Sequence, residues 1–431
     1  MTDHVTSGPK YTRRRVLGGA ATAGGIALAG CSGGGNGSEG AVEPEGSAEL
    51  ELTGWAADDT EADLVRGLAT NFDENQDDIS VTYEPIQSEY EQTMRTRLGG
   101  GEAPDVFYLD ASYFGSFADE GVLLDLDPLT EVDDYNVDDI FDPLLDAFRH
   151  DGTLYGIPKD FSTLSLYYNE SILEEAGVDE VPESWGGLQD ALTAIDETGS
   201  VDAPMLEFAN ARMFWSLLHQ NGGQVLSDDG SELLLDSQEC IEALEYMIEL
   251  RDNGTLAVPS EIGVDWHGQA IGTEAVGMAV IGPWALPALE SDFSDVEGDV
   301  GVAHIPYPTS GERATAAYTV SYSAAADTSA PGASRKLISE LTDDEGMAEW
   351  ARQGLALSAR ESHSDLDYYA NHERRRTHLE AGEWSHPVAF GPNSNAILNR
   401  VNPMLEGAML GEQEPSEALE RATQQVNDEV L

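Results

Sequence analysis

Apolar positions in the first third of the chain alternate between two periods. Leu50, Leu52 and Trp55 predict the start of a short strand, and Ile79, Val81 and Tyr83 alternate with polar residues, which is typical of a strand with one buried face. Between them, residues 61–75 carry Leu64, Leu68 and Phe72 at every fourth position, which predicts a helix. A strand, a helix and a second strand in close succession form a βαβ unit, so the pattern predicts a parallel sheet.

The next apolar segments extend this sheet. Residues 90–98 predict a helix that ends at three consecutive glycines, and the continuous apolar run 105–109 predicts a strand buried on both faces. Asp110 follows this strand directly. Ligands bind beyond the carboxyl ends of strands in open α/β sheets, so Asp110 is a candidate ligand contact.

Elements of both kinds continue to the end of the chain. Asp236 and Glu239 have the spacing of a capping box at the start of a helix that ends at Gly254. Residues 154–168 contain two extended runs flanked by proline and glycine, which suits a crossover between two lobes. Further predicted elements are the helices 184–198, 337–341, 347–350 and 415–430 and the strands 277–281 and 300–305.

The N-terminal residues predict export. Arg13 and Arg14 begin a twin-arginine signature, and a small-residue apolar run ends in Leu28-Ala29-Gly30-Cys31, which resembles a lipobox. The run is too short and too rich in glycine and alanine for a spanning helix of ~20 strongly apolar residues. We therefore expect a signal peptide over residues 1–30, lipid attachment at Cys31 and a flexible tether over residues 31–47. An unstructured N-terminus without these functions is the alternative.

The net charge of the chain limits the classes of molecule that the protein can bind. The chain of 431 residues has 81 acidic and 21 basic residues, a net charge of -60, while 41% of its residues are hydrophobic. It can therefore fold, with an acidic surface that suits high salt, where the Debye length falls to ~3 Å at 1 M. We expect a halophilic protein that does not bind nucleic acid, because no basic surface can be assembled. Carboxylate pairs are so frequent that no single pair indicates acid–base catalysis.

Catalytic and metal-binding motifs do not stand out. The sequence has no nucleophile-elbow serine, HExxH, P-loop or GxGxxG after a strand. His363, His372, His378 and His386 are close in sequence, but three neighbouring arginines disfavour a metal site there. We expect no enzyme activity, no cofactor and no metal.

Aromatic residues suggest a different chemistry. Trp55, Trp284, Tyr318 and Tyr322 fall at predicted strand ends or in turns rich in glycine, proline, serine and threonine. Sugars present apolar faces and a belt of hydroxyl groups, and flat aromatic rings with fixed polar groups bind both. An aromatic residue of this kind, taken alone, is more often part of the core than a ligand platform.

From Glu49 onward the chain resembles the extracellular solute-binding proteins of ABC importers, the type that includes maltose- and trehalose-binding proteins. The segments that carry the resemblance are DVFYLDASYFGSFADEGVLLDLDPL, TLYGIPKDFSTLSLYYNESILEEAGV, NGGQVLSDDG and AVIGPWALPAL. A haloarchaeal member would carry the N-terminal signals described above. The resemblance implies a two-lobe α/β fold of the periplasmic-binding-protein type, with a carbohydrate between the lobes and an ABC permease in the membrane as partner.

The resemblance also implies individual ligand contacts. Asp110 and Glu61 match acidic contacts to sugar hydroxyls, Trp284 matches an aromatic platform, and Arg360 matches a guanidinium that reaches the sugar. Tyr318 stands where members often carry Gly-Gly-Trp, and Asp160 and Ser162 stand where disaccharide binders tend to show Tyr and Asp. Lys159 either binds ligand or pairs with Asp160, and the ion pair is slightly favoured.

These expectations combine into one interpretation. Residues 48–158 with 298–358 form the first lobe, and residues 159–297 with 359–431 form the second. The protein is a monomeric, lipid-anchored lipoprotein at the extracellular face of the membrane that captures a mono- or oligosaccharide for a permease. The alternatives are the same fold binding glycerol-3-phosphate or a peptide, and a secreted glycoside-active enzyme.

Overall fold

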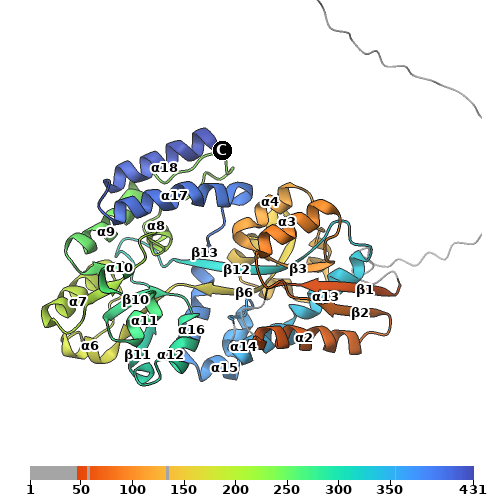
Figure 1. Cartoon of the computed structure of the whole chain (residues 1–431), viewed down its shortest axis with the longest axis horizontal. Coiled ribbons are helices and arrows are strands. Elements are labelled where there is room, and N and C mark those ends of the chain that lie inside the picture. The colour runs from red at the N-terminus through yellow and green to blue at the C-terminus, as the bar shows by residue number, and fades with distance from the viewer. Residues whose placement is uncertain (1–45, 56–58, 133–134, 355) are drawn as a thin grey trace, which may run out of the picture. The chain divides into compact units, whose positions relative to one another are not determined.

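The computed structural model describes residues 46–55, 59–132, 135–354 and 356–431. The predicted signal peptide, Cys31 and nearly all of the predicted tether lie outside the described residues. The rest of the chain forms two larger β-sheets with helices packed around them (Figure 1).

The first sheet has the strand order β13-β12-β3-β1-β2, and β6 pairs with β12. The predicted βαβ unit is confirmed, because β1 pairs in parallel with both β2 and β3, while β12 runs antiparallel to β3 and β6. The strands are β1 (Ala48–Thr53), β2 (Ile79–Tyr83), β3 (Val106–Asp110), β6 (Gly156–Thr163), β12 (Thr315–Ala324) and β13 (Ser385–Pro387).

Helices from both ends of the chain accompany this sheet. The first two predicted helices are confirmed, and the second ends at Gly101, whose φ of 69° is readily adopted by glycine. The helices of this region are α2 (Asp59–Glu74), α3 (Tyr90–Gly100), α4 (Ala111–Asp119), α5 (Asp142–Asp146), α13 (Pro331–Leu341), α14 (Asp344–Gln353), α15 (Asp367–Ala370) and α16 (Glu373–Glu380). The hairpin of β4 (Arg149–His150) and β5 (Thr153–Leu154) precedes β6.

The second sheet has the strand order β11-β7-β10-β8-β9. Its strands are β7 (Ser165–Asn169), β8 (Ala203–Leu206), β9 (Leu256–Ala257), β10 (Val276–Ile281) and β11 (Val300–Ala303). The helices that accompany it are α6 (Glu170–Glu175), α7 (Trp185–Thr198), α8 (Phe214–Gln220), α9 (Gln238–Asp252), α10 (Pro259–Ile262), α11 (His267–Gly272), α12 (Ala285–Ser291), α17 (Ser394–Met409) and α18 (Pro415–Glu429).

Successive residues of the second sheet enter different apolar cores. On β7, Leu166 belongs to the core with α7, α8 and α9, whereas Tyr167 belongs to the core with α11 and α12. Met278 and Ala279 on β10 divide in the same way. Both faces of this sheet are therefore buried, which explains why its strands are continuous apolar runs in the sequence.

The predicted crossover at residues 154–168 is confirmed. β6 pairs with β12 in the first sheet, and β7, which starts two residues after β6 ends, pairs with β10 and β11 in the second. The chain thus passes from one sheet to the other at Leu164.

β12 is the main element that the sequence pattern did not predict. It is ten residues long and pairs with three strands, yet its sequence TAAYTVSYSA contains few large apolar residues. Its small residues have a packing reason, because a Cβ on Gly156 of β6 would lie only 2.5 Å from the Ser321 hydroxyl oxygen. Because β6 and β12 approach closely, small side chains are required between them. β12 therefore lacks the large apolar residues by which a buried strand is usually recognised in a sequence.

Two further expectations need correction. The capping box at Asp236 and Glu239 is wrong, because α9 begins at Gln238, and its N-cap residue is Ser237, whose side chain makes no capping hydrogen bond. The long helix α17 was not predicted, and it carries Pro403 in its interior. In Figure 1, α17 lies beside α18, and it also contacts α9.

The expected lobe boundaries remain a proposal, and the packing suggests how to adjust them. β11 pairs with β7 of the second sheet, while Tyr369 and Leu379 belong to the same apolar core as the first sheet. We propose dividing the chain near Leu164, near Ala314 and after Pro387, so that each lobe contains one complete sheet.

Candidate functional site

The candidate site is a cavity of about 430 Å³ that combines aromatic rings with polar side chains. It lies where the segment after β8, the start of α12, strand β12 and helix α17 approach one another. Its lining residues are Asn210, Arg212, Trp215, Trp284, Tyr318, Val388, Leu398 and Asn402.

Two residues predicted as sugar platforms meet in this cavity. The rings of Trp284 and Tyr318 lie 6.1 Å apart between centroids, at an interplanar angle of 72°. Trp284 is 41% exposed, unusually high for a tryptophan, and it caps α12 directly after β10 and the Gly282-Pro283 turn. A Cβ on Gly282 would lie 2.0 Å from the indole ring, so this glycine lets Trp284 fold back over the turn. The cavity therefore offers an apolar face to a ligand.

Polar groups stand next to these rings. The Oδ1 atom of Asn210 is buried and accepts no hydrogen bond from the described residues. Arg212 is exposed, and its guanidinium lies over the Phe208 ring at 4.9 Å. Asn402 comes from α17 on another wall. An unpartnered amide oxygen is suited to a ligand hydroxyl, which can donate to it, and an accessible guanidinium is suited to a hydroxyl or a carboxylate.

Sequence reasoning missed Asn210, Arg212, Trp215 and Asn402. The first three follow β8, a short strand that contains Pro204 and was not recognised. Had β8 been identified, the rule that ligands bind beyond the carboxyl ends of strands would have pointed to them. Asn402 carries no such signal, because it lies in the interior of a long helix.

Glu207 lies buried behind this segment. Its Oε1 accepts a hydrogen bond from the backbone N–H of Phe208 at 2.7 Å, and burial raises its pKa to about 8. The neighbouring His267 has its Nε2 atom 3.9 Å from Oε1, and burial lowers its pKa to about 3. At pH 7 both groups are therefore largely neutral, so their proximity is not an ion pair.

Asp110 lies near the cavity without lining it. It is the N-cap of α4, where its Oδ1 accepts hydrogen bonds from the Ser112 backbone N–H at 2.8 Å and from the Ser112 hydroxyl at 2.5 Å. Burial raises its pKa, and these hydrogen bonds oppose the increase. Burial also raises the pKa of Tyr318 to about 12, with the Arg212 charge opposing this rise and Glu207 and Asp110 adding to it.

The favoured interpretation of Lys159 is confirmed, because its ammonium forms an ion pair with Asp160. Lys159 is only 2% exposed, and its Nζ atom lies 4.0 Å from the centroid of the Trp350 ring and 4.5 Å from that of Tyr108. The ion pair and the two aromatic faces offset the cost of burying this charge. Neither Lys159 nor Asp160 lines the cavity.

Three other residues that were predicted to contact the ligand lie in the apolar core of the first sheet or pack against it. Tyr322 is completely buried, with its ring 5.2 Å from that of Tyr108, so the expectation that it meets a ligand is corrected. Trp55 packs edge-on against Tyr90 and Tyr108. Glu61 is 7% exposed in the first turn of α2. None of the three lines the cavity.

Arg360 has a structural role in place of the predicted sugar contact. It is 2% exposed, and its five N–H groups all meet protein acceptors at 2.8–3.3 Å. The acceptors are the carbonyl oxygens of Thr342, Asn136 and Tyr135 and the carboxylate of Asp139. No donor is left for a sugar, so we remove Arg360 from the proposed ligand set.

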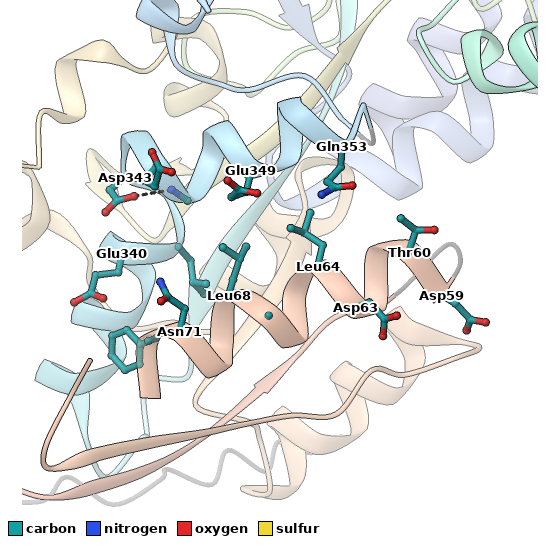
Figure 2. Close-up of a pocket in the computed structure, with 15 residues that line it drawn as sticks. Asp59, Thr60, Asp63, Leu64, Leu68, Asn71, Glu340, Asp343, Glu349 and Gln353 are labelled. Carbon is teal, nitrogen blue, oxygen red and sulfur yellow. Dashed lines mark hydrogen bonds between the residues drawn. The ribbon is translucent and has the colours of Figure 1, made fainter. Parts of the chain in front are cut away.

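A larger groove of about 700 Å³ lies between α2 and α14 (Figure 2). Leu64 and Leu68 of α2 point into it, and Asp59, Asp63 and Glu349 stand along its sides. Phe72 is its one aromatic lining residue, and none of the predicted site residues lines it. Because acidic residues cover much of this chain, the groove has no distinctive chemistry, and the smaller cavity is the better candidate.

The described residues contain no helix long and apolar enough to cross a membrane. They also contain no group of three His, Cys, Asp or Glu side chains placed to hold a metal ion. Instead, His378 is buried beside Tyr167, and His386 stacks on His219 with ring centroids 3.8 Å apart.

Two α/β lobes joined by strands that pass between them, with an aromatic and polar cavity, define the two-lobed class of ligand-binding proteins. A family model described as "Bacterial extracellular solute-binding protein" matches residues 67–377. The chain belongs to this family, which confirms the resemblance found in the sequence.

Solved structures of similar fold support the same class. The cyclic alpha-maltosyl-1,6-maltose binding protein from Arthrobacter globiformis has a TM-score of 0.79 at 24% identity, covering 89% of this chain and 99% of that one. The sugar-binding protein MalE from Xanthomonas citri has a TM-score of 0.80 at 22% identity, covering 88% of this chain and 96% of that one. These similarities confirm the expected two-lobe fold.

Several relatives by sequence are oligosaccharide-binding proteins by name. The arabinooligosaccharide-binding protein of Halalkalibacterium halodurans is 28% identical over 213 residues, which is 48% of this chain and 46% of that protein. The maltodextrin-binding protein MdxE of Bacillus subtilis is 25% identical over 299 residues, which is 67% of this chain and 66% of that protein. The matched region thus spans about half of the first relative and just under two thirds of the second.

Proposed function

We propose that this protein is the substrate-binding component of an ABC importer and captures a carbohydrate for a membrane permease. The observation that carries the proposal is the cavity in which Trp284 and Tyr318 stand beside Asn210, Arg212 and Asn402. Aromatic faces suit the apolar side of a sugar ring, and the amides and the guanidinium suit its hydroxyl groups. The names of the sequence relatives support a saccharide ligand.

The mechanism requires binding without chemistry. A ligand that contacts Trp284 after β10 and Tyr318 on β12 at the same time connects segments from both sheets. Such a ligand favours the arrangement in which both sets of contacts form, and the permease would recognise that arrangement. A glycosidase would instead need two carboxyl groups about 5–9.5 Å apart across the sugar, and the lining of the described cavity contains none.

The cellular location follows from the N-terminal signals. Export by the twin-arginine pathway, lipid attachment at Cys31 and action as a monomer at the extracellular face of the membrane belong to this proposal. The sequence motif at residues 12–31 and the extracellular character of the family support it. The acidic composition supports function in high salt.

Thermal unfolding in multimolar salt tests the function. Mono- and disaccharides, oligosaccharides, glycerol phosphates and peptides are added one at a time, and each ligand is recovered for chemical analysis. A ligand at 100 times its dissociation constant stabilises the protein by about 2.7 kcal/mol. We expect a saccharide to do so and to be recovered intact.

Two variants connect that result to the cavity. Trp284→Ala should abolish the saccharide shift, and Trp284→Phe should retain part of it, because a smaller ring still offers a flat face. Leu410→Ala is the matched control, since Leu410 is also an exposed apolar side chain at 44% exposure. A shift given only by a phosphate or a peptide would contradict the carbohydrate proposal, and a consumed sugar would indicate an enzyme.

A further inference from the structure

The candidate cavity differs in charge from the rest of the chain. Asp and Glu make up 81 of the 431 residues, yet none lines this cavity. The groove between α2 and α14 is the natural comparison, because its lining includes Asp59, Asp63, Glu340, Asp343, Glu345 and Glu349 (Figure 2). The cavity is therefore a local exception to an acidic surface.

Arg212 gives the cavity a positive charge. Most of the described arginines form ion pairs, as Arg251 does with Glu261 and Arg375 with Glu290. Arg212 is exposed, and within the part of the chain that the structure describes its guanidinium forms no ion pair and no hydrogen bond; its contact is with the Phe208 ring. In a chain with almost four acidic residues per basic one, a guanidinium left without a carboxylate is an unusual arrangement.

Neither Glu207 nor Asp110 forms an ion pair with Arg212. Glu207 is buried, lies beyond ion-pair distance from Arg212, and has a pKa of about 8, so it is largely protonated at pH 7. Asp110 is held at the N-terminus of α4 by Ser112 and does not line the cavity. The positive charge of Arg212 therefore acts on whatever occupies the cavity.

The arrangement of the remaining groups limits the kind of anion. Trp284 and Tyr318 provide ring faces, and the Oδ1 atom of Asn210, which has no partner among the described residues, is suited to accept a hydrogen bond from a hydroxyl. A single guanidinium binds one carboxylate through two parallel hydrogen bonds, and the cavity has no second cation for a more highly charged phosphate group. We propose that the ligand is an acidic saccharide, such as a uronic acid or its oligomer, whose carboxylate pairs with Arg212. This inference rests on the proposed carbohydrate function and makes it more specific.

Calorimetric titration with matched sugars tests the inference. Digalacturonate is compared with galactobiose, and glucuronate with glucose, in the same multimolar salt at pH 7. A hydrogen-bonded pair with a charged group contributes about 10- to 100-fold in affinity. We expect each uronate to bind at least about tenfold more tightly than its neutral counterpart.

Variants of Arg212 distinguish a charge effect from loss of shape. Arg212→Gln should remove the preference for the uronate, because uronate affinity should fall by a larger factor than neutral-sugar affinity. Arg212→Lys should retain part of the preference, because a point charge cannot form both parallel hydrogen bonds. Arg421→Gln is the control for net charge, since Arg421 is exposed on α18 and bonds to Gln413.

Each other outcome has a defined meaning. Neutral sugars that bind as tightly as uronates overturn this inference and leave the proposed function standing. An equal loss of both ligands in Arg212→Gln also overturns it, because the guanidinium then serves the sugar ring in general. If neither uronates nor neutral sugars bind, both the inference and the proposed function are wrong.

Discussion

Replacement of Arg360 by alanine separates a structural role from a ligand contact. The change removes five hydrogen bonds, three of them fully buried, and takes a charged donor from three carbonyl oxygens and from the Asp139 carboxylate, which keeps the N–H and hydroxyl of Ser362 as donors. Asp139 keeps only 14% of its side chain exposed, so its charge would remain largely buried. Breaking a buried pair in this way costs about 3–5 kcal/mol. A domain has a total stability of about 5–15 kcal/mol, so the loss is large.

Denaturant unfolding followed by circular dichroism measures this cost. We expect Arg360→Ala to lower the free energy of unfolding by about 3–5 kcal/mol. We expect Arg360→Lys to recover only part of it, because an ammonium cannot satisfy acceptors in the fork geometry. Arg376→Ala is the matched control, since its exposed pair with Glu380, four residues away on the same helix, is worth about 0.3–0.5 kcal/mol.

Ligand binding decides between the two roles. At a temperature where the variant is folded, Arg360→Ala should bind saccharide with nearly unchanged affinity, because the guanidinium lies among protein acceptors. A variant that loses less than about 1 kcal/mol of stability but more than about tenfold in sugar affinity would refute the structural assignment. Arg360 would then be a ligand contact, as the family resemblance implied.

Three further predictions concern the cavity and the buried groups behind it. Gly282→Ala should weaken saccharide binding, because the new Cβ would lie 2.0 Å from the Trp284 ring and displace it, and a ligand affinity equal to wild type would contradict this reasoning. Burial raises the pKa of Glu207 from 4.5 to about 8, so its contribution to stability is present below pH 4.5 and is lost as pH rises toward 8. The difference in free energy of unfolding between Glu207→Gln and the wild type should therefore favour the variant more at pH 8 than at pH 5, with both proteins measured by denaturant titration. Parallel pH profiles for variant and wild type would contradict this prediction. Neither ring nitrogen of His267 has a hydrogen-bond partner among the described residues, and burial lowers the pKa of His267 to about 3. Because the unfolded chain binds a proton at this histidine more readily, His267 lowers the free energy of unfolding as pH falls below 6.5. His267→Leu should reduce acid sensitivity between pH 6.5 and 4 in thermal unfolding, and an unchanged acid profile would show that other groups cause it.

Several elements could be predicted because their signals are local. The βαβ unit at β1, α2 and β2 follows from apolar periods within one segment, and the crossover from β6 to β7 follows from two extended runs. β12 escaped detection because its contact with β6 selects small residues, so a central strand lacks the usual apolar residues. Trp284 and Tyr318 could be predicted as a pair of platforms from their places in turns and from the family resemblance, although in the structure Tyr318 lies within β12.

By itself, the sequence determined the acidic character of the chain, the first βαβ unit with several further helices and strands, the two-lobe fold class and the family. Tertiary structure alone decided which polar side chains are available to a ligand. The acceptors of Arg360 lie between 18 and 225 positions away in the chain, so no local pattern shows that its donors are all used. The guanidinium of Arg212 is available instead, because folding brings it to a cavity whose lining residues come from five separate segments and include no carboxylate. The availability of a charged group depends on the partners that folding places beside it, and those partners are remote in sequence.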